Sequence, residues 1–262
     1  MRIIDFHTHI YPDAIAPKAA ANIGKFYDLP MRFDGTLGAL FNMGEAAGID
    51  AYVVFSVATS EKQVPSINDY IASQVSAHPG KLYGLAAMHP DYVDFGAELD
   101  RIQALGLKGI KLHPDFQRFK IDDARMMPLY AQAERRRLPI VVHTGDSRFD
   151  FSGPQYVLNV MQRYPNLKMI CAHFGGWSQW EQAVKLLAGS GVMVDTCSSL
   201  AFLSTAKAQE LIAAYGEDNV LFGTDYPMWD AKDELAMLRA LDLGDAVLEK
   251  ILSLNAMRVL GI

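Results

Sequence analysis

Cysteine and long apolar runs are both scarce in this chain. The 262 residues include only 2 cysteines, Cys171 and Cys197, whose separation matches no metal-binding or redox motif. This scarcity argues against a disulfide-stabilised fold and favours free buried thiols in a reducing cytosol. No charged segment with a following apolar stretch precedes the first expected strand, and no run of about 18 apolar residues occurs. We therefore expect a soluble, cytoplasmic protein that does not bind membranes.

An excess of positive charge is also missing. The chain has 30 acidic and 24 basic residues, which gives a formal net charge of −6 at pH 7. Its one basic cluster, residues 135–137 next to Glu134, fits a solvated helix end better than a nucleic-acid-binding surface. We therefore expect no nucleic-acid partner. Half of the residues are apolar, enough for the core of a single domain spanning residues 1–262.

Short apolar runs alternate with helical patterns along the whole chain. Each run is hydrophobic almost throughout, as expected of a parallel strand that is covered on both faces. Eight strands are expected, over residues 3–9, 51–58, 82–88, 107–113, 139–144, 167–173, 191–196 and 219–225. Eight units of strand followed by helix predict an α/β protein that folds as a single (β/α)8 TIM barrel.

Glycine and proline mark the expected helix ends. Gly48 follows a helix expected over residues 36–47, and Gly106 follows one that ends at Leu105, where a left-handed cap favours glycine. His78, with Pro79 and Gly80 after it, ends the helix between the second and third strands. The segment 11–34 contains three prolines and is expected to mix short helix with loop. Because it follows the first strand, it could form a lid over a site there.

Five histidines and one aspartate stand where expected strands end. His7 and His9 are two residues apart on a strand, so their rings share one face. Such a pair alone indicates either a metal chelate or two half-exposed strand residues. The other positions favour a metal site, because eight-stranded barrels build active sites at the carboxyl ends of their strands. The full set is His7, His9, His113, His143, His173 and Asp225.

Five strings carry a resemblance to a known family: residues 5–9, 109–114, 172–176, 222–227 and 255–261. In this order they resemble the amidohydrolase superfamily. The closer resemblance is to its amidohydrolase-related branch, which includes aminocarboxymuconate-semialdehyde decarboxylase and related decarboxylases and hydrolases. The resemblance spans essentially the full chain. It implies a distorted barrel that holds one or two divalent metals, commonly zinc, with the ligands His7, His9, His143 and Asp225. It also implies that His173 is either a ligand of a second metal or the residue that deprotonates the reactive water.

The chemistry of these side chains agrees with a metal site. Three imidazoles and one carboxylate suit Zn²⁺, with Mn²⁺ or Fe²⁺ as alternatives, and leave a coordination position for water. Zinc lowers the pKa of a bound water to about 7, which makes hydroxide available at neutral pH. Asp225 could touch both metal and water and carry a proton to the leaving group. The alternative for Asp225 is a helix N-cap.

The fourth expected strand carries Lys111 and His113 on one face. Lys111 could be a carboxylated lysine that bridges two metals, an ammonium that binds a substrate carboxylate, or a core residue whose ammonium reaches solvent. The resembling branch is mostly mononuclear, so we expect an unmodified Lys111 and one metal per chain. His113 is expected in the pocket, and its contact with the metal stays open.

The loops after the fourth to sixth strands offer further substrate contacts. The guanidinium of Arg118 or Arg148 could pair with a substrate carboxylate, although most exposed loop arginines have no such role. Trp177 could form an apolar wall, although aromatic residues near a barrel mouth more often serve packing. The expected substrate-binding residues are Lys111, His113, Arg118, Arg148 and Trp177, and the expected catalytic residues are Asp225 and His173.

These observations favour a metal-dependent hydrolase that acts on a small organic acid, lactone or amide through metal-bound hydroxide. Non-oxidative decarboxylation of an unsaturated or aromatic carboxylic acid is the alternative. In the resembling family, the same combination of a metal, a histidine and an aspartate serves both reactions. A phosphoesterase or nuclease is less favoured, because it would need more phosphate-binding cations. Short loops favour a compact substrate. By analogy with that family alone, the chain could form a homodimer.

Overall fold

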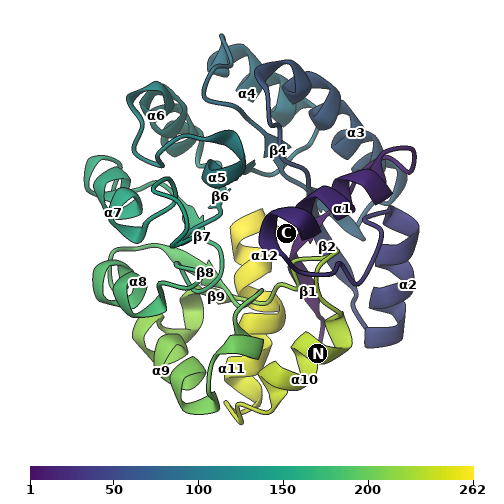
Figure 1. The fold of residues 1–262 in the computed structure, drawn as a ribbon, viewed down its shortest axis with the longest axis vertical. Helices are drawn as coiled ribbons and strands as arrows, with labels where there is room; N and C mark the ends of the chain where they lie inside the picture. The colour runs from purple at the N-terminus through teal and green to yellow at the C-terminus, as the bar shows by residue number, and fades with distance from the viewer.

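Parallel strands surrounded by helices form a (β/α)8 barrel in the computed structural model, which describes residues 1–262 (Figure 1). The strands form two hydrogen-bonded sheets, one in the order β1-β2-β3 and the other in the order β4-β5-β6-β7-β8-β9. The strands are β1 (Ile4–His9), β2 (Ala51–Phe55), β3 (Leu82–Gly84), β4 (Ala86–Ala87), β5 (Ile110–Leu112), β6 (Ile140–Val142), β7 (Met169–Cys171), β8 (Met193–Asp195) and β9 (Val220–Leu221).

β3 and β4 are two halves of one barrel strand, interrupted at Leu85. Leu85 N donates to Val54 O on one side at 3.0 Å, and Ala86 N donates to Gly109 O on the other at 2.8 Å. The strand therefore stays bonded to both neighbours, and the barrel has the eight strand positions that the sequence predicts. Most strands are shorter than predicted. His173 and Asp225 have left-handed φ angles of 60° and 61°, so the chain leaves the ladder before the residues that end the apolar runs.

Hydrogen bonds between β1 and the segment after β9 close the barrel. Phe6 N donates to Phe222 O at 2.9 Å, Asp225 N to His7 O at 2.8 Å, and His9 N to Tyr226 O at 2.8 Å. These bonds continue the parallel pairing past the short β9, with Thr8 and Tyr226 forming an isolated bridge.

The buried Asp5 carboxylate reinforces this closure. Its Oδ2 accepts from Thr224 Oγ1 at 2.6 Å, and its Oδ1 accepts from the backbone N of Thr224 and of His7 at 3.0 and 3.2 Å. Burial raises the pKa of Asp5 to about 7, although the bonds from Thr224 and His7 act in the opposite direction.

Helices cover the outside of the barrel and end as the glycines predict. Thr36 caps α2 by accepting from Ala39 N, and Gly48 ends α2 with a φ of 76°. Gly106 follows α4 with a φ of 81°, and His78 caps α3. The helices are α1 (Ala16–Tyr27), α2 (Leu37–Ala47), α3 (Val64–Ala77), α4 (Phe95–Ala104), α5 (Pro114–Gln117), α6 (Met127–Arg136), α7 (Pro154–Arg163), α8 (Trp180–Leu187), α9 (Thr205–Tyr215), α10 (Ala231–Arg239), α11 (Asp245–Glu249) and α12 (Asn255–Leu260). No helix has the length and apolar character needed to cross a bilayer.

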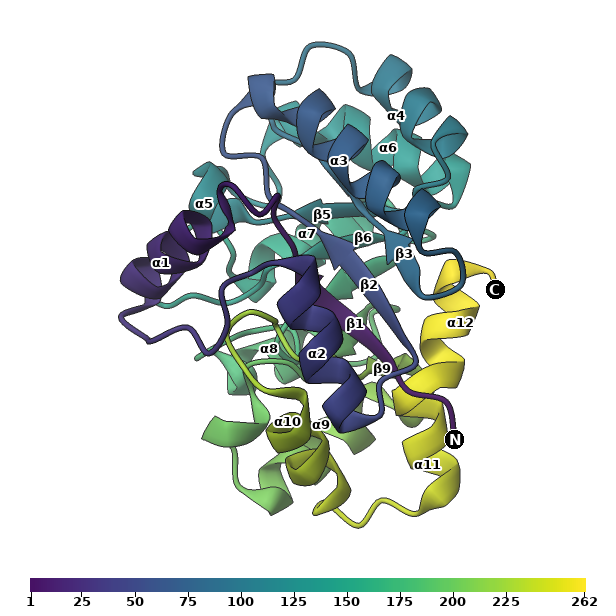
Figure 2. The ribbon, with the colours of Figure 1, turned by 90° about the vertical axis from the view of Figure 1, so that its right-hand side faces the viewer.

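Two cores hold the layers together. A cluster of 54 buried residues fills the space between strands and helices, and a smaller cluster of 12 fills the barrel interior. Ala256, Val259 and Leu260 of α12 belong to the interior cluster, so α12 plugs one end of the barrel. Figure 2 shows α1, from the segment 11–34, over the opposite end, toward which β1 points. The carboxyl ends of the strands therefore open beneath α1.

Glu234 of α10 is a buried acid with few polar contacts. Its side chain is 1% exposed, and Oε2 has no hydrogen-bond partner. Burial, reinforced by the nearby charges of Asp225 and Asp5, raises the pKa of Glu234 well above its ordinary value. Between the ordinary carboxyl pKa and this raised pKa, the folded protein therefore keeps a proton that the unfolded chain has lost. The free energy of unfolding should fall as pH rises through this window.

Replacing Glu234 with glutamine should remove this pH dependence, because the amide stays neutral. We expect metal-free Glu234→Gln to be more stable than the native protein at mildly alkaline pH by at least about 1 kcal/mol, the worth of one pKa unit. The difference should disappear as pH falls to the ordinary carboxyl pKa. Urea unfolding over a pH series measures it, with the exposed Glu249→Gln as control. Parallel pH profiles for the two proteins would show that Glu234 is ionised when folded.

Candidate metal centre

His7, His9 and Asp225 form a group at the carboxyl end of β1. Asp225 Oδ1 lies 3.4 Å from His7 Nε2 and 3.5 Å from His9 Nε2. Both rings are buried, and burial lowers the pKa of His9 to about 4, so that its ring is neutral. Burial opposes ionisation of Asp225, but the surrounding imidazoles, His7 foremost, hold its pKa well below the usual range. The group therefore presents the neutral ring of His9, the ring of His7 and the carboxylate of Asp225.

These separations fit a divalent cation. Donor atoms at 2.0–2.2 Å from a tetrahedral metal are about 3.4 Å from one another. All three donor atoms lie within 4.8 Å of one another. Two imidazole nitrogens and a carboxylate oxygen are ligands that zinc, manganese and iron accept. The residues present therefore fit the metal that the sequence predicts.

Asp195, at the end of β8, orients His7. Its Oδ2 lies 2.7 Å from His7 Nδ1, so Nδ1 carries the proton and the Nε2 lone pair faces Asp225 and the cavity. Burial opposes ionisation of Asp195, yet the interaction with His7 lowers its pKa to about 2. Asp195 was not among the predicted site residues, although it is the next-to-last residue of an expected strand.

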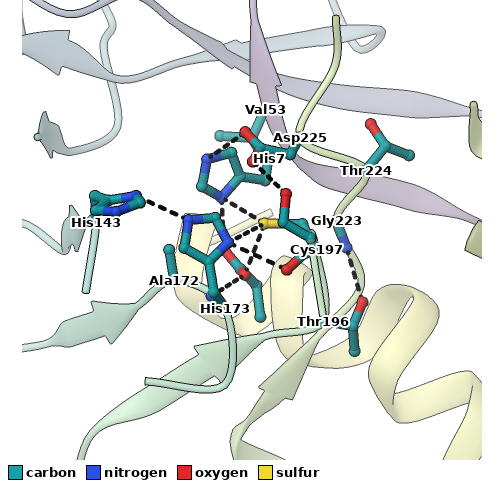
Figure 3. A network of polar contacts seen from close by, with 12 residues as sticks. His7, Val53, His143, Ala172, His173, Thr196, Cys197, Gly223, Thr224 and Asp225 are labelled. Atoms are coloured by element: carbon teal, nitrogen blue, oxygen red, sulfur yellow. Dashed lines mark hydrogen bonds and ion pairs between the residues drawn. The ribbon is translucent and has the colours of Figure 1, made fainter. Parts of the chain in front are cut away.

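A chain of hydrogen bonds fixes the tautomers of His173 and His143 (Figure 3). His173 Nδ1 lies 3.1 Å from the carbonyl of Cys197, which only accepts, so Nδ1 is protonated. His173 Nε2 then accepts from His143 Nδ1 at 2.9 Å. Burial lowers the pKa of both rings, which favours neutral imidazoles. His143 Nε2 is therefore left with a lone pair, and this buried atom has no hydrogen-bond partner.

His143 lines the same cavity as His7, His9 and Asp225 but stands beside their group. Its Nε2 lies 3.5 Å from Asp115 Oδ2 of α5. The structure thus gathers three of the four predicted ligands directly and places the fourth, with a free lone pair, at the cavity wall.

Lys111 points into the barrel beneath this group. Its ammonium lies 3.0 Å from His7 Nε2 and 4.8 Å from the centre of the Phe55 ring. The side chain is 1% exposed, which excludes the alternative that the ammonium reaches solvent. Burial lowers the pKa of Lys111, and it is the only lysine or arginine in the cavity lining.

His113 and α1 complete the cavity. The His113 ring stacks on Phe116 at 3.8 Å and on His143 at 4.0 Å between ring centres. Its Nε2 lies 3.0 Å from the hydroxyl of Tyr27, the last residue of α1. The segment 11–34 therefore contacts the site. No pattern in the sequence predicts the contact of Tyr27 with His113, because Tyr27 does not lie at the end of an expected strand.

The two arginines expected to bind substrate are both absent from the lining of the metal cavity. Arg148 places Nε 2.9 Å and Nη2 2.7 Å from the two oxygens of Asp146, and Nη1 donates to Phe26 O. The guanidinium of Arg148 is thus already bonded to protein atoms. Its central carbon lies 5.7 Å from the centre of the Trp177 ring. Trp177 lines a neighbouring cavity with His173 and Asp225. Arg118 does not line the metal cavity and lies in the wall of an adjacent one.

Comparison with known proteins places the chain among enzymes of one family. A family model described as amidohydrolase matches residues 4–262. The 2-amino-3-carboxymuconate-6-semialdehyde decarboxylase of Dictyostelium discoideum is 24% identical, over 75% of this chain and 66% of that protein. The match thus spans slightly less than two thirds of that relative.

Solved structures share the fold at low sequence identity. An uncharacterized TIM-barrel protein from Bordetella bronchiseptica has a TM-score of 0.82 at 22% identity, covering 100% of this chain and 99% of that one. The 5-carboxyvanillate decarboxylase of Sphingomonas paucimobilis has a TM-score of 0.77 at 17% identity, again covering 100% of this chain and 99% of that one. A 2-pyrone-4,6-dicarboxylic acid hydrolase candidate from Pseudomonas putida has a TM-score of 0.71 at 20% identity, covering 99% of this chain and 97% of that one. Decarboxylases and hydrolases both occur among these similar proteins.

Loss of His9 should abolish tight metal binding, because it removes one of three gathered donors. We expect zinc affinity to fall by more than about a hundredfold, beyond the usual effect of losing an outer contact. Elemental analysis after dialysis against buffered zinc measures this in His9→Ala. The matched control is His78→Gln at the end of α3, which should keep the native metal content. Equal zinc content in all three proteins would place the metal elsewhere.

Lys111 decides between one metal and two. An amine, charged or neutral, offers at most one lone pair and cannot bridge two cations, whereas a carboxylated lysine can. We expect about one equivalent of metal per chain in both the native protein and Lys111→Met. Two equivalents that drop to one in the variant would instead identify a bridging, carboxylated Lys111.

Proposed function

Because the chain belongs to the amidohydrolase family, we propose that it removes the carboxylate of an unsaturated or aromatic acid as CO₂, without oxidation and with the help of a divalent metal. The observation that carries this proposal is a single buried cavity that holds the group of His7, His9 and Asp225 together with one cation, Lys111. A carboxylate is the substrate group that such a cavity attracts. The activity named for the Dictyostelium relative supports the same reaction.

His7, His9 and Asp225 would hold the metal, and His143 would be the fourth ligand. The free lone pair of His143 and its place in the same cavity support that role. We propose Zn²⁺ as the metal, with Mn²⁺ or Fe²⁺ as alternatives for this donor set, and one ion per chain. When bound, the metal would polarise the substrate oxygens. Lys111 would orient the substrate carboxylate through its charge.

The reaction needs one proton. The bond between the carboxyl carbon and the substrate breaks, its electron pair stays on the substrate carbon, and that carbon takes up a proton as CO₂ leaves. Asp225 and His173 would move this proton. Asp225 Oδ2 accepts from Ser198 Oγ at 2.6 Å, and His173 joins His143 through the 2.9 Å hydrogen bond. Groups at such hydrogen-bond distances can transfer a proton.

Hydrolysis of a lactone or amide, which the sequence favoured, is the second candidate. The fold shared with the Pseudomonas hydrolase candidate supports it. Asp225 and His173 would then accept a proton from water and return it to the leaving group. In that reaction water adds to the carbonyl carbon, the bond to the leaving oxygen or nitrogen breaks, and no carbon is lost.

Product analysis in heavy water separates the two candidates. A panel of unsaturated and hydroxylated aromatic acids, lactones and amides would be incubated with the metal-loaded protein. We expect CO₂ release in equal amount to a product that carries one deuterium on the former carboxyl-bearing carbon. Ring opening of a lactone or amide cleavage, with no CO₂ release from any acid, would contradict decarboxylation and favour hydrolysis.

Asparagine in place of Asp225 should separate metal binding from turnover. Asp225→Asn keeps an oxygen donor but loses the proton-carrying carboxylate. On an acid that the panel identifies, we expect metal to stay largely bound while turnover falls by about 10²–10⁴-fold, as is usual for acid–base groups. The exposed Asp242→Asn should behave as the native protein. Near-native turnover in Asp225→Asn would show that another group moves the proton.

A further inference from the structure

The metal cavity is too small for the acid that it is proposed to bind. Its volume is about 20 Å³, and Ile23 and Tyr27 of α1 form part of its wall. A single buried water needs about 10–15 Å³, whereas sites for small organic molecules usually measure about 300–1,000 Å³. An unsaturated or aromatic acid can therefore enter only if part of this wall moves.

α1 is a weakly packed part of the wall. No residue of α1 belongs to either apolar core. A cavity of about 600 Å³ lies between α1 and α3, and Ala19, Ile23 and Phe26 of α1 face this open space. In Figure 2, α1 stands apart from the helices that cover the barrel. Elements with few buried apolar contacts open at a low cost in free energy.

The segment 11–34 leaves and rejoins the barrel at neighbouring points. Tyr11 N donates to Gly35 O at 3.0 Å, and Gly35 has a left-handed φ of 84°. Surface loops whose ends meet in this way are frequently functional. A hinge at these terminal residues would let α1 lift while the strands keep their places.

Arg148 fastens the last turn of α1 to the mouth of the barrel. Its Nη1 donates to Phe26 O at 2.8 Å, and its guanidinium carbon lies 5.0 and 5.2 Å from the ring centres of Phe26 and Tyr27. A cation is favourable beside the last carbonyls of a helix. Asp146 holds the same guanidinium from the loop after β6. The bond to Phe26 O is exposed, so water can replace it when α1 lifts.

The hydroxyl of Tyr27 keeps a proton that it can donate. Phe116 N donates to His113 Nδ1 at 3.4 Å, so the neutral ring carries its proton on Nε2. Nε2 then donates to Tyr27 Oη at 3.0 Å. No protein atom accepts the hydroxyl proton of Tyr27, and Tyr27 lines the metal cavity together with Asp225. An oxygen of a bound acid would supply the missing acceptor.

We propose that α1 is a lid that lifts to admit the acid and then rests on it, with the Tyr27 hydroxyl donating to one of its oxygens. Arg148 is a positioning residue that holds the lid over the empty cavity through Phe26. This inference rests on the proposed function only in that an acid binds in the metal cavity. It therefore applies to decarboxylation and to hydrolysis alike.

Hydrogen exchange followed by mass spectrometry tests the lid without turnover. In the zinc-loaded protein, we expect the amides of α1 to exchange at least tenfold faster than those of α3, and to slow about tenfold with saturating benzoate. Arg148→Lys keeps a cation beside Asp146 but loses the planar fork that also reaches Phe26 O. Its α1 should exchange at least about threefold faster than native α1 without benzoate. The exposed Arg135→Met of α6 should match the native protein.

Tyr27→Phe tests the hydroxyl, because the ring stays and only the donor is lost. We expect benzoate to bind about tenfold more weakly by calorimetry, as loss of one hydrogen bond to a charged group would give. Exchange of α1 without benzoate should stay native, which a purely structural role would not predict. Tyr83→Phe, whose hydroxyl does not line the metal cavity, should bind benzoate normally. Native benzoate affinity in Tyr27→Phe would overturn the role of this hydroxyl.

Release of CO₂ is measured on the same proteins to keep this inference distinct from the proposed reaction. Fast exchange of α1 that benzoate slows, without CO₂ release from any acid, would support the lid and contradict decarboxylation. Release of CO₂ by native protein whose α1 exchanges as slowly as α3, with and without benzoate, would overturn the lid alone.

Discussion

Closure of the barrel between β1 and the segment after β9 is the constraint on which the site depends. The bond from Asp225 N to His7 O and the Asp5 contacts with Thr224 bring β1 and the segment after β9 side by side. Gly223 permits this approach, since a Cβ atom there would lie 2.7 Å from His7 Cβ. Once these segments meet, Asp225 lies against both imidazoles of the pair. The grouping of these three candidate metal ligands is thus a consequence of how the barrel closes.

Hydrogen bonds from surrounding residues fix which ring nitrogens of these histidines carry protons. Asp195 fixes the proton on His7 Nδ1, and the carbonyl of Cys197 fixes the proton on His173. With its proton on Nδ1, His173 keeps a lone pair on Nε2 that accepts from His143 Nδ1. His143 in turn keeps a lone pair on Nε2. Burial lowers the pKa of His9, His143 and His173 and so favours neutral rings, and neutral rings are the form that binds a metal.

The sequence predicts what local patterns control. Apolar runs mark the eight strands, Gly48 and Gly106 mark helix ends, and the histidines at strand ends mark the mouth of the barrel. Tertiary contacts decide the rest. His143 turns toward His173, Arg148 pairs with Asp146, and Tyr27 reaches His113 from a helix whose position no periodicity reveals. The cavity between α1 and α3 escaped prediction for the same reason, because packing of α1 over the mouth creates it.

Cys197 provides the sharpest test of where the metal binds. Its sulfur lies 3.2 Å from His7 Nδ1 and from His173 Nδ1, so two alternative clusters of metal-binding groups include this thiol. X-ray absorption at the zinc edge of the loaded protein distinguishes them directly. The account predicts a first shell of nitrogen and oxygen alone at about 2.0–2.2 Å, with imidazole scattering. A sulfur ligand at about 2.3 Å would contradict it and place the metal at Cys197.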